Sequence, residues 1–538
     1  MISQLCLKEM KTLNTYCFLF LLCCLGCKTN EVVKTNLKSE IPATVENWTI
    51  TSQEGMVENI VSSEGIEIKE GLLFPKNKFG KITTKIKSFT KKRSAKKLEI
   101  AQSPIWKNWT ETSQLGTSNM ADAPVFLRKA PNDYWIFARN NSKKNKEFVA
   151  VDTTLNGFDV ALKTTPIKFQ FDALGGLKEG LGGYHAWQSH DMVNWVHHGP
   201  VSDYPARWMT TAEQVGDKTY LYYDFPNDQD PHLIIDTDLT DGKMGKKMGI
   251  AFKDPSDGSD CAIIRDLEGN FHLILENWSP LNASKRSWDS PLASHAVSKD
   301  GISGFQLVAP AVDYRTKPTG KFDEYAHPHW HKEDPENFPG RIATEDVPQH
   351  RIKKGQTKAF AKYEIHEPEQ PAYGDWAAIA ISGQYYLFGD YDPVGLHGRA
   401  NMKTAWFTSS DINKPFTFCG AVGKGHPDPD IMFANGQFYL ISQTNDFVSP
   451  GPWVETVTAR VGIDTDNNGK INQWTEWQVV KESYDYVEGF AKQVSKLPAE
   501  LDLSELPMGY GFQIELKLED STENDAKPMI ASIELSFE

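Results

Sequence analysis

The chain has 538 residues, a formal net charge of −14 and 11% aromatic side chains. The aromatic content, together with 40% hydrophobic residues, excludes an intrinsically disordered chain, and the acidic balance excludes a general nucleic-acid binder. The one long apolar run leaves no room for a bundle of membrane helices. We therefore expect a soluble, β-rich globular protein with one large domain and a smaller one.

The first element predicted from the N-terminus is an export signal. The apolar run 16–25 follows a short basic region and is too short to span a bilayer comfortably. It ends in Leu25-Gly26-Cys27, which resembles the lipobox of bacterial lipoproteins, whose cysteine is lipidated. We expect residues 1–26 to be removed and residues 27–46 to tether a lipid-anchored protein to the outer membrane, at the cell surface or in the periplasm. The alternative is an ordinary secretory signal.

The middle of the chain contains a repeat. Five segments share a polar residue, a short apolar run, a turn and an aromatic-rich apolar run, which together predict a β-hairpin. Hairpins that cannot bury both faces alone must stack, and a ring is an economical closed arrangement. We therefore predict an all-β chain in which residues 116–480 form a five-bladed β-propeller. The repeats are Asp122–Phe137, Thr210–Tyr223, Asp260–Leu275, Asp375–Phe388 and Asp430–Ile441.

The propeller geometry predicts a site at the openings of the repeats. The innermost strand of every blade begins near the axis, so the residues that open the repeats converge at one mouth. Packed carboxylates raise one another's pKa, as acid–base chemistry requires, although a single Asp before a strand is usually a turn residue. The side chains expected at the mouth are Asp122, Glu213 or its neighbours, Asp260, Asp375 and Asp430.

The two ends of the chain predict a second, smaller domain. Residues 47–115 contain strand patterns, and residues 481–538 contain the strictly alternating segment Tyr510–Leu518. We expect the two ends to meet in a small accessory β-sandwich attached to the propeller. Its role, as a packing element or as a carbohydrate-binding accessory, stays open.

A short acidic loop follows the last repeat. Asp464, Asp466 and Asn468 have the one-three-five oxygen spacing of a calcium loop, but Thr475 stands where a glutamate is expected at the twelfth position. The loop predicts a structural Ca²⁺ site, with a plain Asn-Gly turn as the alternative.

Parts of the chain resemble a known group of enzymes. The segments Ser189–Trp195 and His366–Trp376, with the Asp-opened repeats, resemble the five-bladed glycoside hydrolases of family 43 and, more closely, family 117. Family 117 contains exo-acting enzymes that remove 3,6-anhydro-L-galactose from agar oligosaccharides. The resemblance covers residues 121–462 and implies an exo-acting, inverting glycosidase that acts on oligosaccharides of a marine or algal polysaccharide.

The resemblance also implies roles for individual residues. Asp122 would be the general base that activates water, and Asp260 would tune the pKa of the acid and hold the substrate. His366 would be the general acid, with Glu367 orienting it or binding the sugar, while Glu213 and His295 are rival acids. The substrate-binding residues expected around them are Glu213, His295, Asp375, Trp376, Arg399 and Asp430.

Two other functions stay open from the residues alone. One is a non-catalytic, surface glycan-binding lipoprotein. The other is a propeller polysaccharide lyase, which would need a Tyr or His base and cationic groups such as Arg207 and Arg399. Hydrolysis needs no organic cofactor, and the sequence shows no Gly-rich phosphate loop or nicotinamide fingerprint. The expected partners are a saccharide substrate and, through the lipid anchor only, a membrane, with no nucleic acid.

Overall fold

The structure is a computed structural model of the whole chain. It describes residues 45–103, 106, 120–141, 181–202, 208–224, 230–254, 260–277, 292–312, 372–392, 402–423, 428–444, 447–448, 456–520 and 527–538. Strands dominate these ranges, which contain one α-helix, α1 (Gln53–Asn59), so the nearly all-β prediction is confirmed. No helix in this described part has the length and apolar character needed to cross a membrane. The predicted signal peptide and Cys27 lie outside the described residues.

Within the described residues, segment 120–441 forms five antiparallel sheets. The first contains β8 (Met120–Ala130), β9 (Asp133–Asn141), β10 (Leu181–Ser189) and β11 (Val196–Pro200). The second contains β12 (Trp208–Val215), β13 (Lys218–Asp224), β14 (Pro231–Asp236) and β15 (Lys246–Ile250). The third contains β16 (Ala262–Arg265), β17 (Phe271–Glu276), β18 (Ala293–Ser298) and β19 (Gln306–Leu307). The fourth contains β20 (Ala372–Ile381), β21 (Gln384–Asp392), β22 (Lys403–Ser409) and β23 (Thr417–Val422), and the fifth contains β24 (Asp430–Ala434) and β25 (Gln437–Ile441).

The turns between the first two strands of these sheets follow from their residues. Ser382 and Gly383 between β20 and β21 both have positive φ, as do Asn435 and Gly436 between β24 and β25. Two consecutive positive φ angles favour a two-residue hairpin turn, because its twist matches that of the strands. The predicted hairpins are therefore formed at these two turns.

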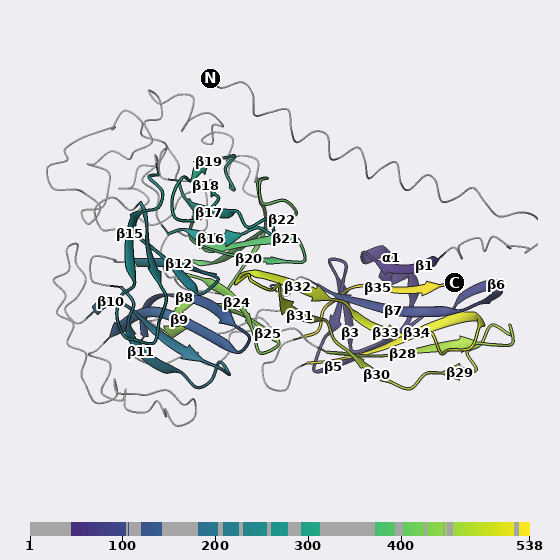
Figure 1. Cartoon of the computed structure of the whole chain (residues 1–538). Helices are drawn as coiled ribbons and strands as arrows, with labels where there is room; N and C mark the ends of the chain where they lie inside the picture. The colour runs from purple at the N-terminus through teal and green to yellow at the C-terminus, as the bar shows by residue number, and fades with distance from the viewer. Residues whose placement is uncertain are drawn as a thin grey trace, which may run out of the picture. The chain divides into compact units, whose positions relative to one another are not determined.

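The first strands of the five sheets close a cycle (Figure 1). β8 contacts β12, β12 contacts β16, β16 contacts β20, β20 contacts β24, and β24 returns to β8. Among the described residues, a hydrophobic cluster lies between each pair of consecutive sheets. The cluster between the fifth and first sheets joins Met432 and Tyr439 to Phe126 and Ile136, so the hydrophobic packing runs all the way around the ring.

A buried carboxylate joins the fifth sheet to the first. Asp430 Oδ2 accepts a hydrogen bond from the backbone N–H of Phe126 at 2.6 Å, and Oδ1 accepts one from Ile431 at 2.7 Å. In the described residues β24 pairs with β25 and not with β8, so no ladder of backbone hydrogen bonds crosses this seam. Hydrogen bonds to a charged group contribute more than neutral ones, so Asp430 stabilises the closure of the ring.

The two ends of the chain supply two larger antiparallel sheets. One contains β1 (Glu46–Thr51), β3 (Ile66–Lys69), β4 (Leu72–Pro75), β7 (Ala95–Gln102), β33 (Ala499–Asp502) and β35 (Ile530–Phe537). The other contains β2 (Ile60–Glu64), β5 (Phe79–Thr84), β6 (Lys87–Arg93), β28 (Val457–Asp464), β29 (Gln473–Trp474), β30 (Gln478–Val480) and β34 (Gly509–Glu519). Alternate side chains of both sheets, such as Ile100, Val461, Ile514 and Leu535, enter one hydrophobic cluster. The N- and C-terminal segments therefore build a common core, which we call the terminal core.

Two boundaries differ from those expected from the sequence. Strand β28, which was expected in the propeller together with residues up to 480, pairs with β34 and buries Val457, Ala459 and Val461 in the terminal core. β29 and β30 in turn pair with β28. The later strands β31 (Ser483–Tyr486) and β32 (Gln493–Leu497) instead extend the fourth sheet, because β32 pairs with the edge of β20. Described strands β26 (Gln443–Thr444) and β27 (Phe447–Val448) form a short separate pair.

The terminal core gives a test of this fold. Leu535 in β35 is fully buried, so Leu535→Ala should lower the free energy of unfolding by about 2–5 kcal/mol through lost burial and a cavity. Glu534→Ala on the opposite face removes only exposed hydrogen bonds to Asn47 and Thr49, and should cost less than about 1 kcal/mol. Urea denaturation measures both, and equal losses would contradict the assignment of Leu535 to the core.

Candidate active site

The inner strands are irregular near their starts. The pairing register shifts at residues 121–125 of β8, 209–211 of β12 and 374–377 of β20. Such bulges turn side chains away from the regular alternation of a strand and are common next to active sites. Three of the five sheets therefore carry the same kind of irregularity at the same end of the inner strand.

Three aspartates at this end have a left-handed backbone. Asp260 has φ of 50°, Asp375 has φ of 50° and Asp428 has φ of 36°. They lie immediately before or within the first residues of the third, fourth and fifth sheets. A positive φ is uncommon outside glycine and is kept only where the surroundings hold it, often at functional sites.

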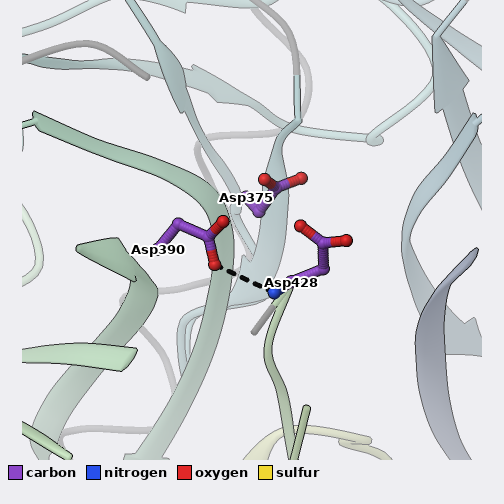
Figure 2. A group of neighbouring side chains, drawn as sticks. All are labelled: Asp375, Asp390 and Asp428. Carbon is purple, nitrogen blue, oxygen red and sulfur yellow. Dashed lines mark hydrogen bonds between the residues drawn. The ribbon is translucent and has the colours of Figure 1, made fainter. Parts of the chain in front are cut away.

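Carboxylates from the second strands hold this backbone in place. Asp224, the last residue of β13, accepts a hydrogen bond from the N–H of Asp260 at 3.1 Å. Asp390 in β21 likewise accepts one from the N–H of Asp428 at 2.9 Å (Figure 2). In both pairs, a buried carboxylate of one sheet fixes the aspartate that opens the next sheet. Glu276, the last residue of β17 in the third sheet, is also buried.

The opening aspartates and their supports form one group of acids, which we call the carboxylate cluster. One carboxylate oxygen from each of Asp375, Asp390 and Asp428 lies within 4.8 Å of the other two (Figure 2). Burial raises the pKa of Asp375 well above its usual value, and the charges of Asp260, Asp428, Asp390 and Glu276 raise it further. The backbone N–H of residue 376 donates to the carbonyl oxygen of Asp260 at 3.1 Å, which holds the third and fourth sheets together here.

The closeness of these carboxylates limits how many of them are ionised at the same time. Ionised carboxylates this close repel one another, so a proton or a cation that offsets part of the charge stabilises the cluster. A retained proton gives a general acid next to ionised carboxylates that can act as bases. Oxygen ligands of this type also suit a hard cation such as Ca²⁺, for which Asp375, Asp390 and Asp428 are the residues near enough to one another.

Two of the residues expected at the mouth, Asp260 and Asp375, are thus brought together by the structure. Trp376, expected to contact sugar, is instead buried between the third and fourth sheets, where its ring packs near Tyr373 and Phe407. Both carboxylate oxygens of Asp430 accept backbone N–H groups, as described for the ring closure.

Glu213 lies in a different place from the carboxylate cluster. Its side chain is buried, and Oε1 accepts a hydrogen bond from the N–H of Ala491 at 3.4 Å. Burial raises its pKa to about 7, while the positive charges of Lys492 and Arg265 act in the opposite direction. The structure therefore groups this rival acid with a lysine from the C-terminal part of the chain.

His295, the second rival acid, belongs to a buried chain of side chains inside the third sheet. Its Nε2 lies 2.9 Å from Nδ1 of His272, and Nε2 of His272 lies 3.0 Å from Oδ2 of Asp266. Burial lowers the pKa of His295 to about 3. A neutral imidazole at ordinary pH does not favour a role for His295 as a proton donor.

The proposed base can be placed by its backbone alone. Asp122 follows the residue that pairs with Arg139, just as Asp375 follows the residue that pairs with Asp390. The two aspartates therefore occupy equivalent bulges in the first and fourth sheets. The side chain of Asp122 and the whole of His366, Glu367 and Arg399 lie outside the described residues.

The predicted calcium loop lies at the end of β28, in the terminal sheets. Asp464 Oδ1 accepts the N–H groups of Asp466, Asn467 and Asn468, and Oδ2 accepts that of Gly469 at 2.9 Å. Backbone donors thus hold the carboxylate that opens the loop, and they lower its pKa. Calcium binding by Asp464, Asp466 and Asn468 stays a prediction.

Four acids of the cluster were missed by the sequence analysis: Asp224, Glu276, Asp390 and Asp428. A signal for three of them exists, because the second strand of three repeats reaches a carboxylate after its aromatic or aliphatic run. These runs are Tyr220–Asp224, Phe271–Glu276 and Tyr386–Asp390. Asp428 stands two residues before Asp430, the residue that the repeat pattern selected.

The buried carboxyl of Glu213 predicts a pH dependence of stability. Its folded pKa of about 7 lies above its ordinary value of 4.5, so its contribution is complete below pH 4.5 and is lost as the pH rises to 7. The loss should be on the order of 3 kcal/mol. Denaturation between pH 4.5 and 8 should show a smaller decline in Glu213→Gln than in wild type. The exposed Glu268→Gln serves as control, and an unchanged decline in Glu213→Gln would refute the assignment.

Comparisons with known proteins find similar solved structures only. A scan against protein-family models gives no match, and neither does a search of curated proteins. Among solved structures, a thermostable family-43 glycoside hydrolase aligns with 74% of this chain and 98% of its own, at 10% identity and a TM-score of 0.36. Arabinanase Arb43A of Bacillus subtilis aligns over 63% and 96%, at 12% identity and a TM-score of 0.35. A GH43 enzyme from Xanthomonas citri complexed with xylotriose aligns over 68% and 94%, at 13% identity and a TM-score of 0.37.

Proposed function

We propose that this chain is a glycoside hydrolase whose catalytic part is a five-bladed β-propeller. The closed cycle of inner strands and the hydrophobic packing between consecutive sheets support the propeller. The two terminal sheets that share the terminal core are then the accessory β-sandwich.

The observation that carries this proposal is the convergence of Asp260, Asp375, Asp390 and Asp428 at the starts of three inner strands. Glycoside hydrolysis needs one carboxyl group that donates a proton and another that activates water or stabilises positive charge on the sugar. A cluster that must hold a proton or cation among ionised carboxylates supplies both kinds of group. Asp260, Asp375 and Asp428 have a left-handed backbone, which regular strand pairing does not require. Such a conformation is often kept at functional sites.

Within this site we assign roles on the resemblance together with the geometry. Asp122, at the bulge equivalent to that of Asp375, is the general base, and Asp260 holds the sugar and tunes the acid. His366, oriented by Glu367, is the general acid that the resemblance implies. Asp375 is the alternative donor, since its neighbours favour its protonated form.

The finer description of the enzyme rests on the sequence. The resemblance of 189–195 and 366–376 to family 117 supports an exo-acting, inverting enzyme for oligosaccharides of a marine or algal polysaccharide. The apolar run 16–25 and Leu25-Gly26-Cys27 support a lipoprotein of the outer membrane. Hydrolysis of this kind needs no organic cofactor.

The two rival functions differ in their demands on the site. A lyase that acts on uronic acids must bind a sugar carboxylate, which the negative charges of Asp260, Asp390 and Asp428 would repel. A binding lipoprotein needs no crowded acids, because neutral hydrogen-bonding groups hold sugars without the cost of burying charge. The carboxylate cluster therefore favours hydrolysis over both.

Incubation with a panel of algal oligosaccharides tests the proposal. A hydrolase gives new reducing ends with inverted anomeric configuration, measured by proton NMR. A lyase gives an ultraviolet-absorbing unsaturated end, and a binding protein gives no product. Either of the last two results, with a sugar that binds, would reject the hydrolase.

Substitution of the carboxylates is the matching test on the active enzyme. Asp260→Asn and Asp375→Asn should each lower kcat by about 10²–10⁴-fold, because each removes a charge or a proton at the reacting bond. Sugar affinity, measured by calorimetry, should remain, since amides keep most of the hydrogen bonds. Glu268→Gln, on an exposed turn of the third sheet, is the control and should keep full activity. A fully active Asp260→Asn would remove this residue from the site.

A further inference from the structure

Residues 484–496 cross the ring at the end away from the carboxylate cluster; we call them the floor segment. They meet the inner strands at or towards their C-terminal ends, whereas the cluster lies at the starts. Ala491 N–H donates to Glu213 of β12, the Gln493 side chain donates to the carbonyl of Arg265 of β16, and the N–H of Ala380 of β20 donates to the carbonyl of residue 492.

The floor segment also reaches the two remaining sheets. The N–H of Phe433 in β24 donates to the hydroxyl of Tyr486 at 3.0 Å. The guanidinium of Arg128 in β8 lies 4.3 Å from the centre of the Tyr486 ring. The floor segment, 13 residues from 484 to 496, thus contacts the inner strand of each of the five sheets of the ring.

Lys492 is the charged residue of this segment that points into the ring. Its side chain is 5% exposed, and Nζ donates to Thr211 Oγ1 and to the carbonyl oxygen of Ile263, both at 2.8 Å. The hydroxyl of Thr211 also accepts the N–H of Ile263 at 3.3 Å. The ammonium therefore bridges β12 and β16 through neutral oxygens, and a buried ammonium needs a negative charge nearby.

That negative charge comes from the ring. Lys492 acts electrostatically on two buried acids of the ring, Glu213 of β12 and Asp430 of β24. Both oxygens of Asp430 accept backbone N–H groups, whereas Glu213 retains one buried oxygen, Oε2, that accepts no hydrogen bond. Among the described residues, Arg265 also acts on Glu213, the charge of Glu213 acts on Tyr222, and Lys492 also acts on the thiol of Cys261. Arg265 is engaged elsewhere, since its guanidinium donates to the carbonyl of Gly489 and lies over the ring of Phe490.

We propose that Lys492 is an internal cation of the propeller: a positioning residue, supplied by the floor segment, that bridges β12 to β16 as a clamp and compensates the charge of buried acids such as Glu213. The clamp acts at Ile263, three residues after Asp260, so it fixes the strand on which that carboxylate is mounted. The effect of the clamp on catalysis through Asp260 rests on the proposed hydrolase function. The electrostatic interaction between Lys492 and Glu213 does not depend on that function.

A set of four proteins tests the pairing by stability alone: wild type, Lys492→Met, Glu213→Gln and the double variant. Without the ammonium, the pKa of Glu213 should rise, so the loss of stability with pH in Lys492→Met should continue above pH 7. The double variant should lose this extension and be more stable than Lys492→Met at pH 8, because a neutral amide replaces the buried carboxyl of Glu213. Denaturant midpoints between pH 5 and 9 measure all four.

Lys403→Met is the control. Lys403 lies on β22 of the ring and is exposed, so its replacement removes one positive charge without taking a partner from a buried acid. This variant should keep the pH profile of wild type. A Lys492→Met profile parallel to that of wild type, or a double variant no more stable than Lys492→Met, including one that does not fold, would overturn the proposal.

Activity separates this proposal from the enzymatic one. If wild type hydrolyses a sugar, Lys492→Met should lower kcat about tenfold or more with a smaller change in KM, since Asp260 is misplaced while sugar contacts remain. An unchanged kcat would refute the positioning of Asp260 by the clamp. If no sugar is hydrolysed by any variant, the hydrolase proposal fails, while the stability measurements still decide the pairing of Lys492 with Glu213.

Discussion

Repulsion between carboxylates is the constraint on which the rest of this structure depends. Asp260, Asp375 and Asp428 open three inner strands, and burial together with their mutual charge favours the protonated form of Asp375. The ring is needed to hold them together, because each comes from a different sheet. Asp224 and Asp390 do the holding, through the backbone N–H groups of the aspartates in the next sheet. One pair of acids thus holds the backbone of another pair in place.

The charges along the ring are arranged in two groups. At the strand starts, acids face acids, and the balance must come from a proton, a cation or a substrate. Towards the strand ends, the ammonium of Lys492 lies in the ring and acts on the buried acids Glu213 and Asp430, so part of the balance is supplied by the chain itself.

Turns and single strands could be predicted from the sequence, because nearby residues determine them. Hairpin turns such as Asn435-Gly436, and the alternation in Tyr510–Leu518, depend on nearby residues and were predicted correctly. β28 was misplaced because its alternation would suit either a blade or a terminal sheet, and only its partner β34 decides. The closeness of Asp260 to Asp375 follows from their places at the openings of two repeats. Asp390 was not predicted, since a carboxylate at the end of a strand looks like a turn residue until the neighbouring sheet is known.

The pairing of β1 with β35 brings residue 46 beside residue 537. Residues 120–441, with all five sheets of the ring, lie between these partners along the chain, so the ring is an insertion within the terminal fold. During synthesis on the ribosome, β1 and β7 must wait for β35, which is made last, whereas the ring can begin to assemble earlier. Unpaired strand edges are prone to aggregate, so chaperone binding before β35 is made has a direct bearing on the yield of folded protein.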